Sequence, residues 1–317
     1  MLVALVRRRE VKGVECCPDY VLDYMIDIKM CKRILLLLLL ISSATLLRSQ
    51  SILSRSEVGL GLGGMTYIGD LNDQSMLGKV RPAAGLTARL NIDPHWAVAL
   101  GFSYGQVEGG NPDVIARRNL SFRSPIAEGF LRAEFNFFPY GLISNTQKLS
   151  TPYIFCGVGL FKFNPKAKYT EPATGESTWY ELQPLATEGQ GTMAYPDRQM
   201  YQLLEVCMPF GIGYKWRLSR SVHLSVEYGW RKTWTDYLDD VSTTYVGAEV
   251  LNPGDGRGMM AVVLADRSGE VEPGYVNPVG VKRGDDSLKD WYSFFHISLT
   301  FSAEVLFGWM RGKVCEL

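Results

Sequence analysis

The stretch Pro209–Ser242, PFGIGYKWRLSRSVHLSVEYGWRKTWTDYLDDVS, contains two runs in which apolar residues alternate with small, polar or charged ones. A period of two over this length predicts β-strands rather than helices. The polar break between the runs, Ser219–Ser221, is three residues long, so it places Leu218 opposite Val222 in one hairpin. The apolar residues then share one face: Phe210, Ile212, Tyr214, Trp216, Leu218, Val222, Leu224, Val226, Tyr228 and Trp230.

The other face of this hairpin carries glycine together with charges of both signs, such as Lys215 and Glu227. The wet face of a soluble β-sandwich would be rich in Lys, Glu and Thr. Glycine weakens a strand and marks crowding or close approach of neighbouring chains. Small residues mixed with both charges suit the narrow interior of a small membrane barrel, whose aromatic face meets lipid. The hairpin therefore favours a membrane barrel over a soluble β fold.

The N-terminal region has the pattern of an export signal. Lys32-Arg33 precedes the apolar run Ile34–Leu47, which is too short for a spanning helix and predicts a secretory signal peptide; an N-terminal membrane anchor is the alternative. We expect 1–29 to be a non-native extension caused by an over-long start site, 30–49 the signal peptide, 50–306 the barrel and 307–317 a short tail. The formal net charge of zero gives no reason to expect nucleic acid.

The cysteines predict neither a disulfide framework nor a metal site. Only Cys156, Cys207 and Cys315 follow the expected cleavage position, and they form an odd, scattered set. Cys156 and Cys207 fall in predicted strands. A bridge between them stays open, but two buried thiols are the favoured interpretation.

Eight segments of the mature chain read as strands, and their connections alternate in length. Two turns, 93–95 and 219–221, have three residues, and a third, around 141–150, has about a dozen. Short turns at one end and long loops at the other are typical of an outer-membrane barrel, and an even number of antiparallel strands closes without edges. The predicted strands are 57–68, 83–92, 96–104, 125–138, 153–163, the two strands of the hairpin, and 291–301; the long loops are 69–82, 106–124, 164–200 and 236–290.

A closed barrel of about eight strands has an interior that side chains can fill. Buried charges are very costly unless they are paired, so opposite charges on neighbouring strands should form a salt-bridged plug rather than an open pore. The predicted interior network consists of Arg89, Glu128, Arg132, Glu134, Lys215, Arg217, His223, Glu227 and Arg231.

Several segments, spread over nearly the whole mature chain, resemble the PorG-like outer-membrane proteins. They are GGMTYIGDL (63–71), NLSF (119–122), AEFNFFPY (133–140), TPYIFCGVGLFKFNPKA (151–167), 209–218, RKTWTDYLDDVSTTY (231–245) and 290–301. The resemblance implies a non-enzymatic component of the type IX secretion system, associated with a periplasmic ring built from a lipoprotein and its partner. It implies no catalytic residues and no cofactor. Its most specific element is a motif loop that includes Thr235, Asp236, Tyr237, Asp239 and Asp240.

Three residue sets allow other chemistry. His223, Ser225 and Glu227 are the residue types of a lipid-modifying hydrolase, but they follow one another along one strand face, which favours a salt-bridged interior. Asp236, Asp239 and Asp240 could bind Ca²⁺. Their spacing instead favours a structural loop paired with Arg231 or Lys232, so no metal site is expected. Arg117 and Arg118 could contact lipopolysaccharide phosphates, the alternative being a solvated loop.

The sequence thus predicts an outer-membrane barrel, in contact with outer-membrane lipids, that serves type IX secretion. One rival is a generic OmpA-like or OmpW-like barrel for envelope integrity or passage of small molecules; the other is a lipid-modifying enzyme. An OmpW-like role needs an apolar cavity, which the charged interior argues against. If a periplasmic ring is the partner, it must contact the short turns.

Overall fold

The computed structural model describes residues 52–72, 79–110, 118–140, 148–252 and 258–306. The expected extension 1–29, signal peptide 30–49 and tail 307–317 lie outside these residues. From Leu53 onward the described residues belong to one compact unit.

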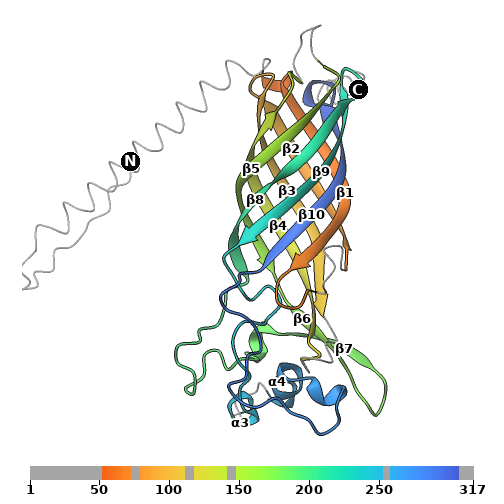
Figure 1. Ribbon diagram of the computed structural model, residues 1–317. Coiled ribbons are helices and arrows are strands. Elements are labelled where there is room, and N and C mark those ends of the chain that lie inside the picture. Colours follow the sequence, from red (N-terminus) through yellow and green to blue (C-terminus); the bar gives the residue numbers. More distant parts are fainter. Residues whose placement is uncertain (1–51, 73–78, 111–117, 141–147, 253–257, 307–317) are drawn as a thin grey trace, which may run out of the picture. The chain divides into compact units, whose positions relative to one another are not determined.

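Eight long strands form a closed antiparallel barrel, as Figure 1 shows. Each strand pairs with its neighbours around the ring in the order β3-β2-β1-β10-β9-β8-β5-β4, and pairing of β3 with β4 closes it. The predicted fold class is therefore confirmed. The strands are β1 (Ser56–Ile68), β2 (Arg81–Asn91), β3 (Trp96–Gly110), β4 (Ser121–Asn136), β5 (Ser150–Phe163), β8 (Leu204–Arg217), β9 (Val222–Thr233) and β10 (Trp291–Ser302).

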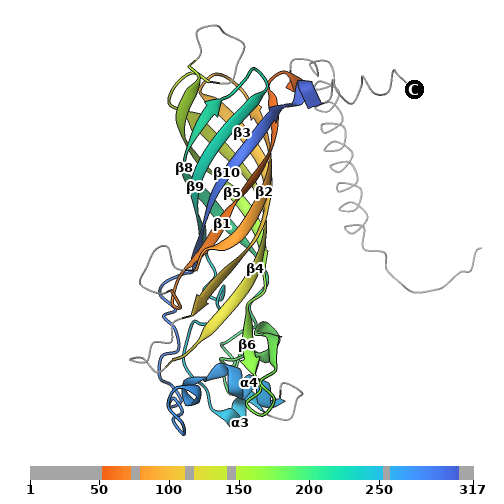
Figure 2. The same cartoon turned by 90° about the vertical axis from the view of Figure 1, so that its right-hand side faces the viewer.

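Strands β3 and β4 run further than the sequence predicted. They remain paired up to Gly110 and Ser121, so much of the expected loop 106–124 is strand; Figure 2 shows β4 continuing toward the loops. Alternation persists because Val107 and Phe122 are buried beneath the loops at this end. Strand β8 also begins earlier than predicted, at Leu204.

Two of the long connections also fold into structure that the sequence did not predict. The connection after β5 contains the hairpin of β6 (Lys166–Thr170) and β7 (Ser177–Glu181) and the 3-10 turn η1 (Gln183–Leu185). The connection before β10 contains α3 (Ala248–Leu251), α4 (Gly258–Ala265) and the 3-10 turn η2 (Ser268–Glu270). We call the described residues of 164–203 and 234–290 the loop lobe.

None of the helices in the described ranges is both long and apolar enough to cross a membrane.

The outer wall of the barrel is apolar, and the inner face is small or polar. Leu60 and Leu62 on β1 expose 68% and 72% of their surface, whereas Gly61 between them is buried. At Gly211 the close neighbouring strand requires glycine, because an added Cβ would meet the carbonyl oxygen of Tyr228. Exposed apolar residues on the wall include Leu86, Trp96, Leu100, Phe102, Leu131, Ile154, Val158, Leu160, Val206, Ile212, Trp216, Phe295, Ile297 and Leu299.

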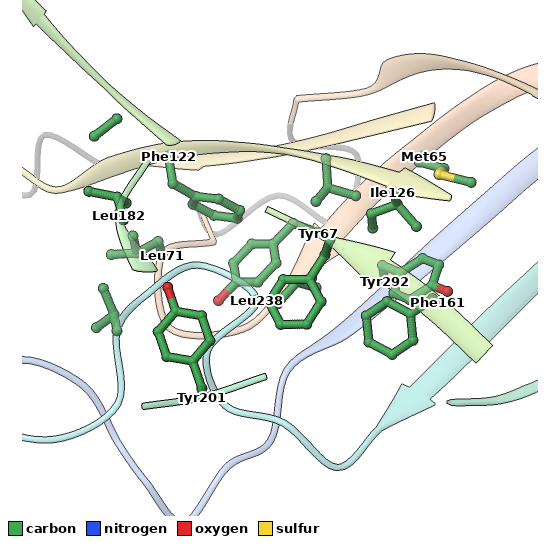
Figure 3. Packing of buried hydrophobic residues seen from close by; sticks show 14 of the residues in the cluster. Met65, Tyr67, Leu71, Phe122, Ile126, Phe161, Leu182, Tyr201, Leu238 and Tyr292 are labelled. Carbon is green, nitrogen blue, oxygen red and sulfur yellow. The ribbon is translucent and has the colours of Figure 1, made fainter. Parts of the chain in front are cut away.

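At the loop end, the barrel interior is filled by a hydrophobic core that continues into the loop lobe (Figure 3). Met65, Ile126 and Phe161 come from the strands, and Leu182 and Leu238 come from the lobe. The predicted plug was wholly charged. Met65, Ile126 and Phe161 lie within the predicted strands, but only charged side chains were counted in the predicted plug, and Leu182 and Leu238 lie in segments predicted as loops.

The two cysteines of the described chain lie on opposite faces. Cys156 is exposed on the outer wall and Cys207 is buried inside, and both are free thiols. The expectation of two buried thiols was wrong for Cys156. Side chains alternate between the two faces of β5, and Cys156 lies two residues from both Ile154 and Val158, which are exposed. Cys156 therefore faces outward with them.

Candidate functional site

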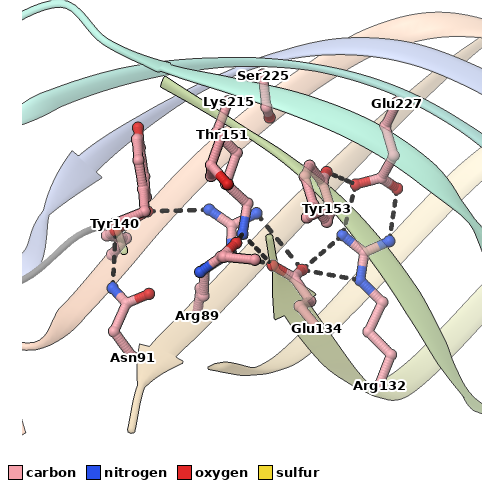
Figure 4. A network of polar contacts seen from close by, with 12 residues as sticks. Arg89, Asn91, Arg132, Glu134, Tyr140, Thr151, Tyr153, Lys215, Ser225 and Glu227 are labelled. Carbon is pink, nitrogen blue, oxygen red and sulfur yellow. Dashed lines mark hydrogen bonds and ion pairs between the residues drawn. The ribbon is translucent and has the colours of Figure 1, made fainter. Parts of the chain in front are cut away.

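The turn-side half of the interior is held by a network centred on Glu134 (Figure 4). This buried carboxylate accepts from Arg89 Nε at 2.7 Å, Arg132 Nη2 at 2.9 Å and Lys215 Nζ at 2.6 Å. Three cations on three different strands therefore converge on one carboxylate of β4. Burial makes each of these bonds strong and makes each unpaired charge costly.

Two further carboxylates balance the cations. Arg89 Nη1 lies 2.9 Å from Glu57 Oε2, and Asn91 donates to the other oxygen of Glu57 at 2.8 Å. Arg132 donates two bonds to Glu227, at 2.5 and 2.6 Å, and the Tyr153 hydroxyl donates a further one. Three carboxylates thus face three cations, and we call these six residues the ionic plug: Glu57, Arg89, Arg132, Glu134, Lys215 and Glu227.

A second buried pair lies nearer the loop end. Arg231 Nε lies 3.2 Å from Glu128 Oε2, and Ser103 donates to the same oxygen at 3.1 Å. Cys207 and Tyr292 border this pair and lead into the hydrophobic core. The interior of the barrel is thus filled along its length by the ionic plug, the Arg231–Glu128 pair and the hydrophobic core.

The remaining predicted interior residues are placed separately. His223 Nδ1 is 2.7 Å from the Tyr140 hydroxyl, and Ser225 Oγ is 2.6 Å from Ser298 Oγ. Within the described chain neither side chain bonds to Glu227, so the hydrolase residue types form no nucleophile–base pair. Arg217 is only partly buried, at the end of β8, and forms no ion pair with any residue whose placement is described.

The motif loop closes the loop end of the barrel around a pair of carboxylates. The Tyr67 hydroxyl lies 2.6 Å from Asp239 Oδ2 and 2.8 Å from Asp290 Oδ1. One hydroxyl proton can serve only one of these oxygens, so full contact requires a proton on the carboxylate pair. Burial, followed by repulsion from Asp290, raises the pKa of Asp239 well above its usual range. Burial likewise raises the pKa of Asp290.

A second part of the motif loop is tied to the lobe by Arg283. Its Nη1 lies 3.0 Å from Glu188 Oε1 and bonds to the carbonyl oxygen of Asp240. Thr187 and Tyr201 donate to the Asp240 carboxylate at 2.5 and 2.7 Å. Burial nevertheless raises the pKa of Asp240 to about 6.

The other members of the motif loop also bond within the lobe. Ser242 donates to Asp236 at 2.6 Å, and burial raises the pKa of Asp236 to about 6. The Thr235 hydroxyl accepts from the backbone N–H of Tyr237 at 3.2 Å, and the Tyr237 ring stacks on Tyr201 at 4.7 Å. These contacts tie the motif loop to the rest of the loop lobe.

One partner assignment made from the sequence needs correction. Arg231 lies inside the barrel on Glu128, in the predicted interior network, and therefore does not pair with the motif loop; the loop pairs with Arg283 instead. Arg118 donates to the Arg283 carbonyl at 3.1 Å, while Arg117 lies outside the described residues. Within the described ranges no group of three or more His, Cys, Asp or Glu side chains is placed to hold a metal ion.

Sequence reasoning missed several residues that complete these networks. The alternation along β1 could have revealed Glu57 as an interior residue. Val58 and Leu60 face outward, so Glu57 must face inward. Glu188 and Arg283 offered no such signal. They lie in irregular segments 95 positions apart, so only the folded lobe brings them together.

Comparisons with known proteins found one family model and several solved structures of low sequence identity. A family model described as a domain of unknown function, DUF6089, matches residues 32–186. Neisserial surface protein A has 9% identity and a TM-score of 0.37, covering 78% of this chain and 96% of its own. OprG from Pseudomonas aeruginosa has 11% identity and a TM-score of 0.35, covering 78% and 95%. Ail of Yersinia pestis has 10% identity and a TM-score of 0.33, covering 78% and 96%. No curated protein matches.

Proposed function

We propose that this chain is a non-conducting, non-enzymatic barrel of the outer membrane that serves the type IX secretion machine as its membrane-embedded anchor. The resemblance to PorG-like proteins supports the secretion role. The apolar wall supports the membrane location, since side chains such as Leu62, Leu100 and Ile212 are exposed around the ring. Placed in lipid, this band becomes buried; placed in water, it would be an aggregation hazard.

The observation that carries the anchoring role is the sealed interior. The ionic plug is neutral, because three carboxylates face three cations, and it spans the barrel from β1 and β2 to β8 and β9. Glu134 at its centre has no exposed surface. The hydrophobic core and motif loop then close the loop end. A barrel built this way holds its shape and its place in the membrane rather than passing solutes.

The orientation follows from the connections. Short turns of outer-membrane barrels face the periplasm and long loops face outward. The two three-residue turns are stiffened by side chains: Asp93 Oδ1 accepts from the N–H groups of His95 and Trp96, and Ser219 Oγ accepts from those of Ser221 and Val222. We infer that a periplasmic ring contacts this end, and that the loop lobe lies outside the cell.

The test is site-specific photo-crosslinking in intact cells. The crosslinking residue replaces Arg220 in the 219–221 turn or, as the matched control, Thr174 in the exposed tip of the β6–β7 hairpin. Recovery of the ring lipoprotein from position 220 but not from position 174 supports the secretion role. Ring crosslinks confined to position 174 would contradict the orientation.

The same purified protein tests the seal in planar bilayers. We expect no steady conductance above that of protein-free bilayers. A stable channel formed by the wild-type chain would contradict the anchoring role and favour a barrel for small-molecule passage. Isolation of the barrel without any ring protein would favour a general envelope role.

A further inference from the structure

An apolar groove of about 620 Å³ lies on the outer wall of the barrel across β3, β4 and β5. This volume falls in the range of about 300–1,000 Å³ that is usual for small-molecule sites. Its lining is aliphatic, aromatic or glycine, with no charged or hydroxyl side chain: Leu100, Gly101, Phe102, Gly129, Phe130, Leu131, Val158, Gly159, Leu160 and Val206.

The groove exists because β4 presents small residues between two strands that present large ones. Gly129 pairs with Phe102 of β3 on one side and with Leu160 of β5 on the other. One pair further along, Ala127 lies between Tyr104 and Lys162. A Cβ built on Gly129 would meet no atom within 4 Å, so the space over β4 is open.

The groove leads toward basic side chains at the loop end. Lys162 is exposed and follows Leu160 by two positions, which is roughly 7 Å along a strand. Leu160 lines the groove and also faces outward. A long flexible ammonium therefore stands directly beyond the apolar lining, on the side where the apolar wall ends.

A second basic cluster lies at the loop ends of β2, β3 and β4. Lys79, Arg81 and Arg123 all contact Glu108, so three cations share one carboxylate and leave a net charge of +2. The Nε of Arg81 is buried without a hydrogen-bond partner in the part of the chain that is described. Arg123 is four positions beyond Ala127, or roughly 14 Å along the strand. Its guanidinium lies 4.6 Å from the centre of the Trp179 ring.

We propose that this groove binds one acyl chain of a lipid A-type glycolipid, whose two phosphates contact Lys162 and the Arg81–Arg123 cluster. The apolar lining fits the acyl chain. Arginine and lysine bind phosphate, and basic sites beside a membrane-facing wall recognise lipid headgroups. Lys162 on β5 and the cluster of Arg81 on β2 and Arg123 on β4 are two separate basic positions, which match a headgroup with two separate phosphates better than a phospholipid with one. The inference rests on the proposed membrane location and names the lipid that contacts this wall.

The experiment measures lipid retention by native mass spectrometry of the full-length protein in detergent. The probes are bisphosphorylated lipid A, its dephosphorylated form and phosphatidylglycerol. Gly129→Leu fills the groove where the backbone leaves open space, and Lys162→Gln removes the nearer charge. Lys232→Gln, on β9 near the same end of the barrel, is the matched control.

We expect wild type and Lys232→Gln to retain bisphosphorylated lipid A. Gly129→Leu should weaken retention of both lipid A forms at least tenfold, and Lys162→Gln should weaken that of the phosphorylated form alone. Equal retention by wild type and Gly129→Leu, or a preference for phosphatidylglycerol, would overturn the proposal.

These outcomes are separable from those for the proposed function. Heat-modifiable migration on gels verifies that each variant is a folded barrel before lipid is added. Cell fractionation tests the membrane location independently, and the ring crosslinks do not enter the lipid measurement.

Discussion

Arg132 of β4 and Glu227 of β9 join across the barrel through two hydrogen bonds of 2.5 and 2.6 Å. The two strands are not neighbours, because β5 and β8 lie between them on the nearer side of the ring. The pair therefore ties together parts of the wall that backbone hydrogen bonds do not connect directly. Both side chains are almost completely buried, at 2% and 1% exposure.

Removal of Arg132 should destabilise the barrel strongly. Arg132→Met leaves Glu227 buried and short of its main partner, and breaking a buried pair in this way costs about 3–5 kcal/mol. The free energy of unfolding in urea, measured in lipid vesicles, checks this. Arg220→Met in the exposed turn is the control and should leave it unchanged.

The double variant Arg132→Met with Glu227→Gln separates pairing from packing. Removing both charges leaves no unpaired carboxylate, so we expect it to recover part of the stability that Arg132→Met loses. A double variant less stable than the single one would show that the charges act independently.

The Asp239–Asp290 pair should make the loop lobe sensitive to pH. Burial raises the folded-state pKa values of both groups above their ordinary ones, so the folded lobe binds more protons than the unfolded chain. The stability that these raised pKa values give the folded lobe is fully present below pH ~4, which is near the ordinary pKa of aspartate. It declines as the pH rises above this value, and each group's share is fully lost once the pH exceeds its raised folded-state pKa, which is about 6 for Asp236 and Asp240.

Amide exchange of the lobe between pH 5 and 9, corrected for intrinsic rates, measures this effect. In the wild-type protein, the protection of lobe amides from exchange should fall as the pH rises. Asp239→Asn removes one titrating group and should flatten the profile. Asp286→Asn, at an exposed carboxylate, should follow wild type. Protection that rises with pH would contradict the shared-proton interpretation.

Arg283 should stabilise the loop lobe but not the barrel. Arg283→Ala leaves the buried carboxylates of Glu188 and Asp240 without their cation, at a cost of about 3–5 kcal/mol. Limited trypsin digestion should then cleave within the lobe, while the strands stay resistant and the protein keeps its folded-barrel migration. Loss of the folded barrel itself would show that lobe and barrel unfold together.

The barrel could be predicted from sequence because its information is local. Alternation from Phe210 to Leu218 fixes both the strand and its outward face, and a three-residue turn fixes the register of the next strand. Inward charges such as Arg132 follow from the same parity. The partners of these charges across the barrel interior cannot be predicted in this way, because several carboxylates lie within reach of each cation.

The loop lobe could not be predicted because its contacts are distant and aperiodic. Helix α4, GMMAVVLA, is apolar on all sides and short, so it shows no helical stripe. The bond between Glu188 and Arg283 joins two irregular segments. The groove over Gly129 could not be predicted either. A glycine on the outer face of a strand indicates a weak strand position and gives no sign of a groove.

Cysteine labelling should report which face of the wall meets lipid. Cys156 is exposed outward, while Cys207 is buried inside next to Glu128. In a chain whose other cysteines are replaced by serine, a lipid-soluble maleimide should label the folded protein in vesicles at position 156 and spare position 207. Unfolding in urea should make both thiols reactive, and Cys156→Ser is the control for residual labelling. Equal labelling of both thiols in the folded protein would mean that the interior is open to the reagent, which would contradict the sealed barrel.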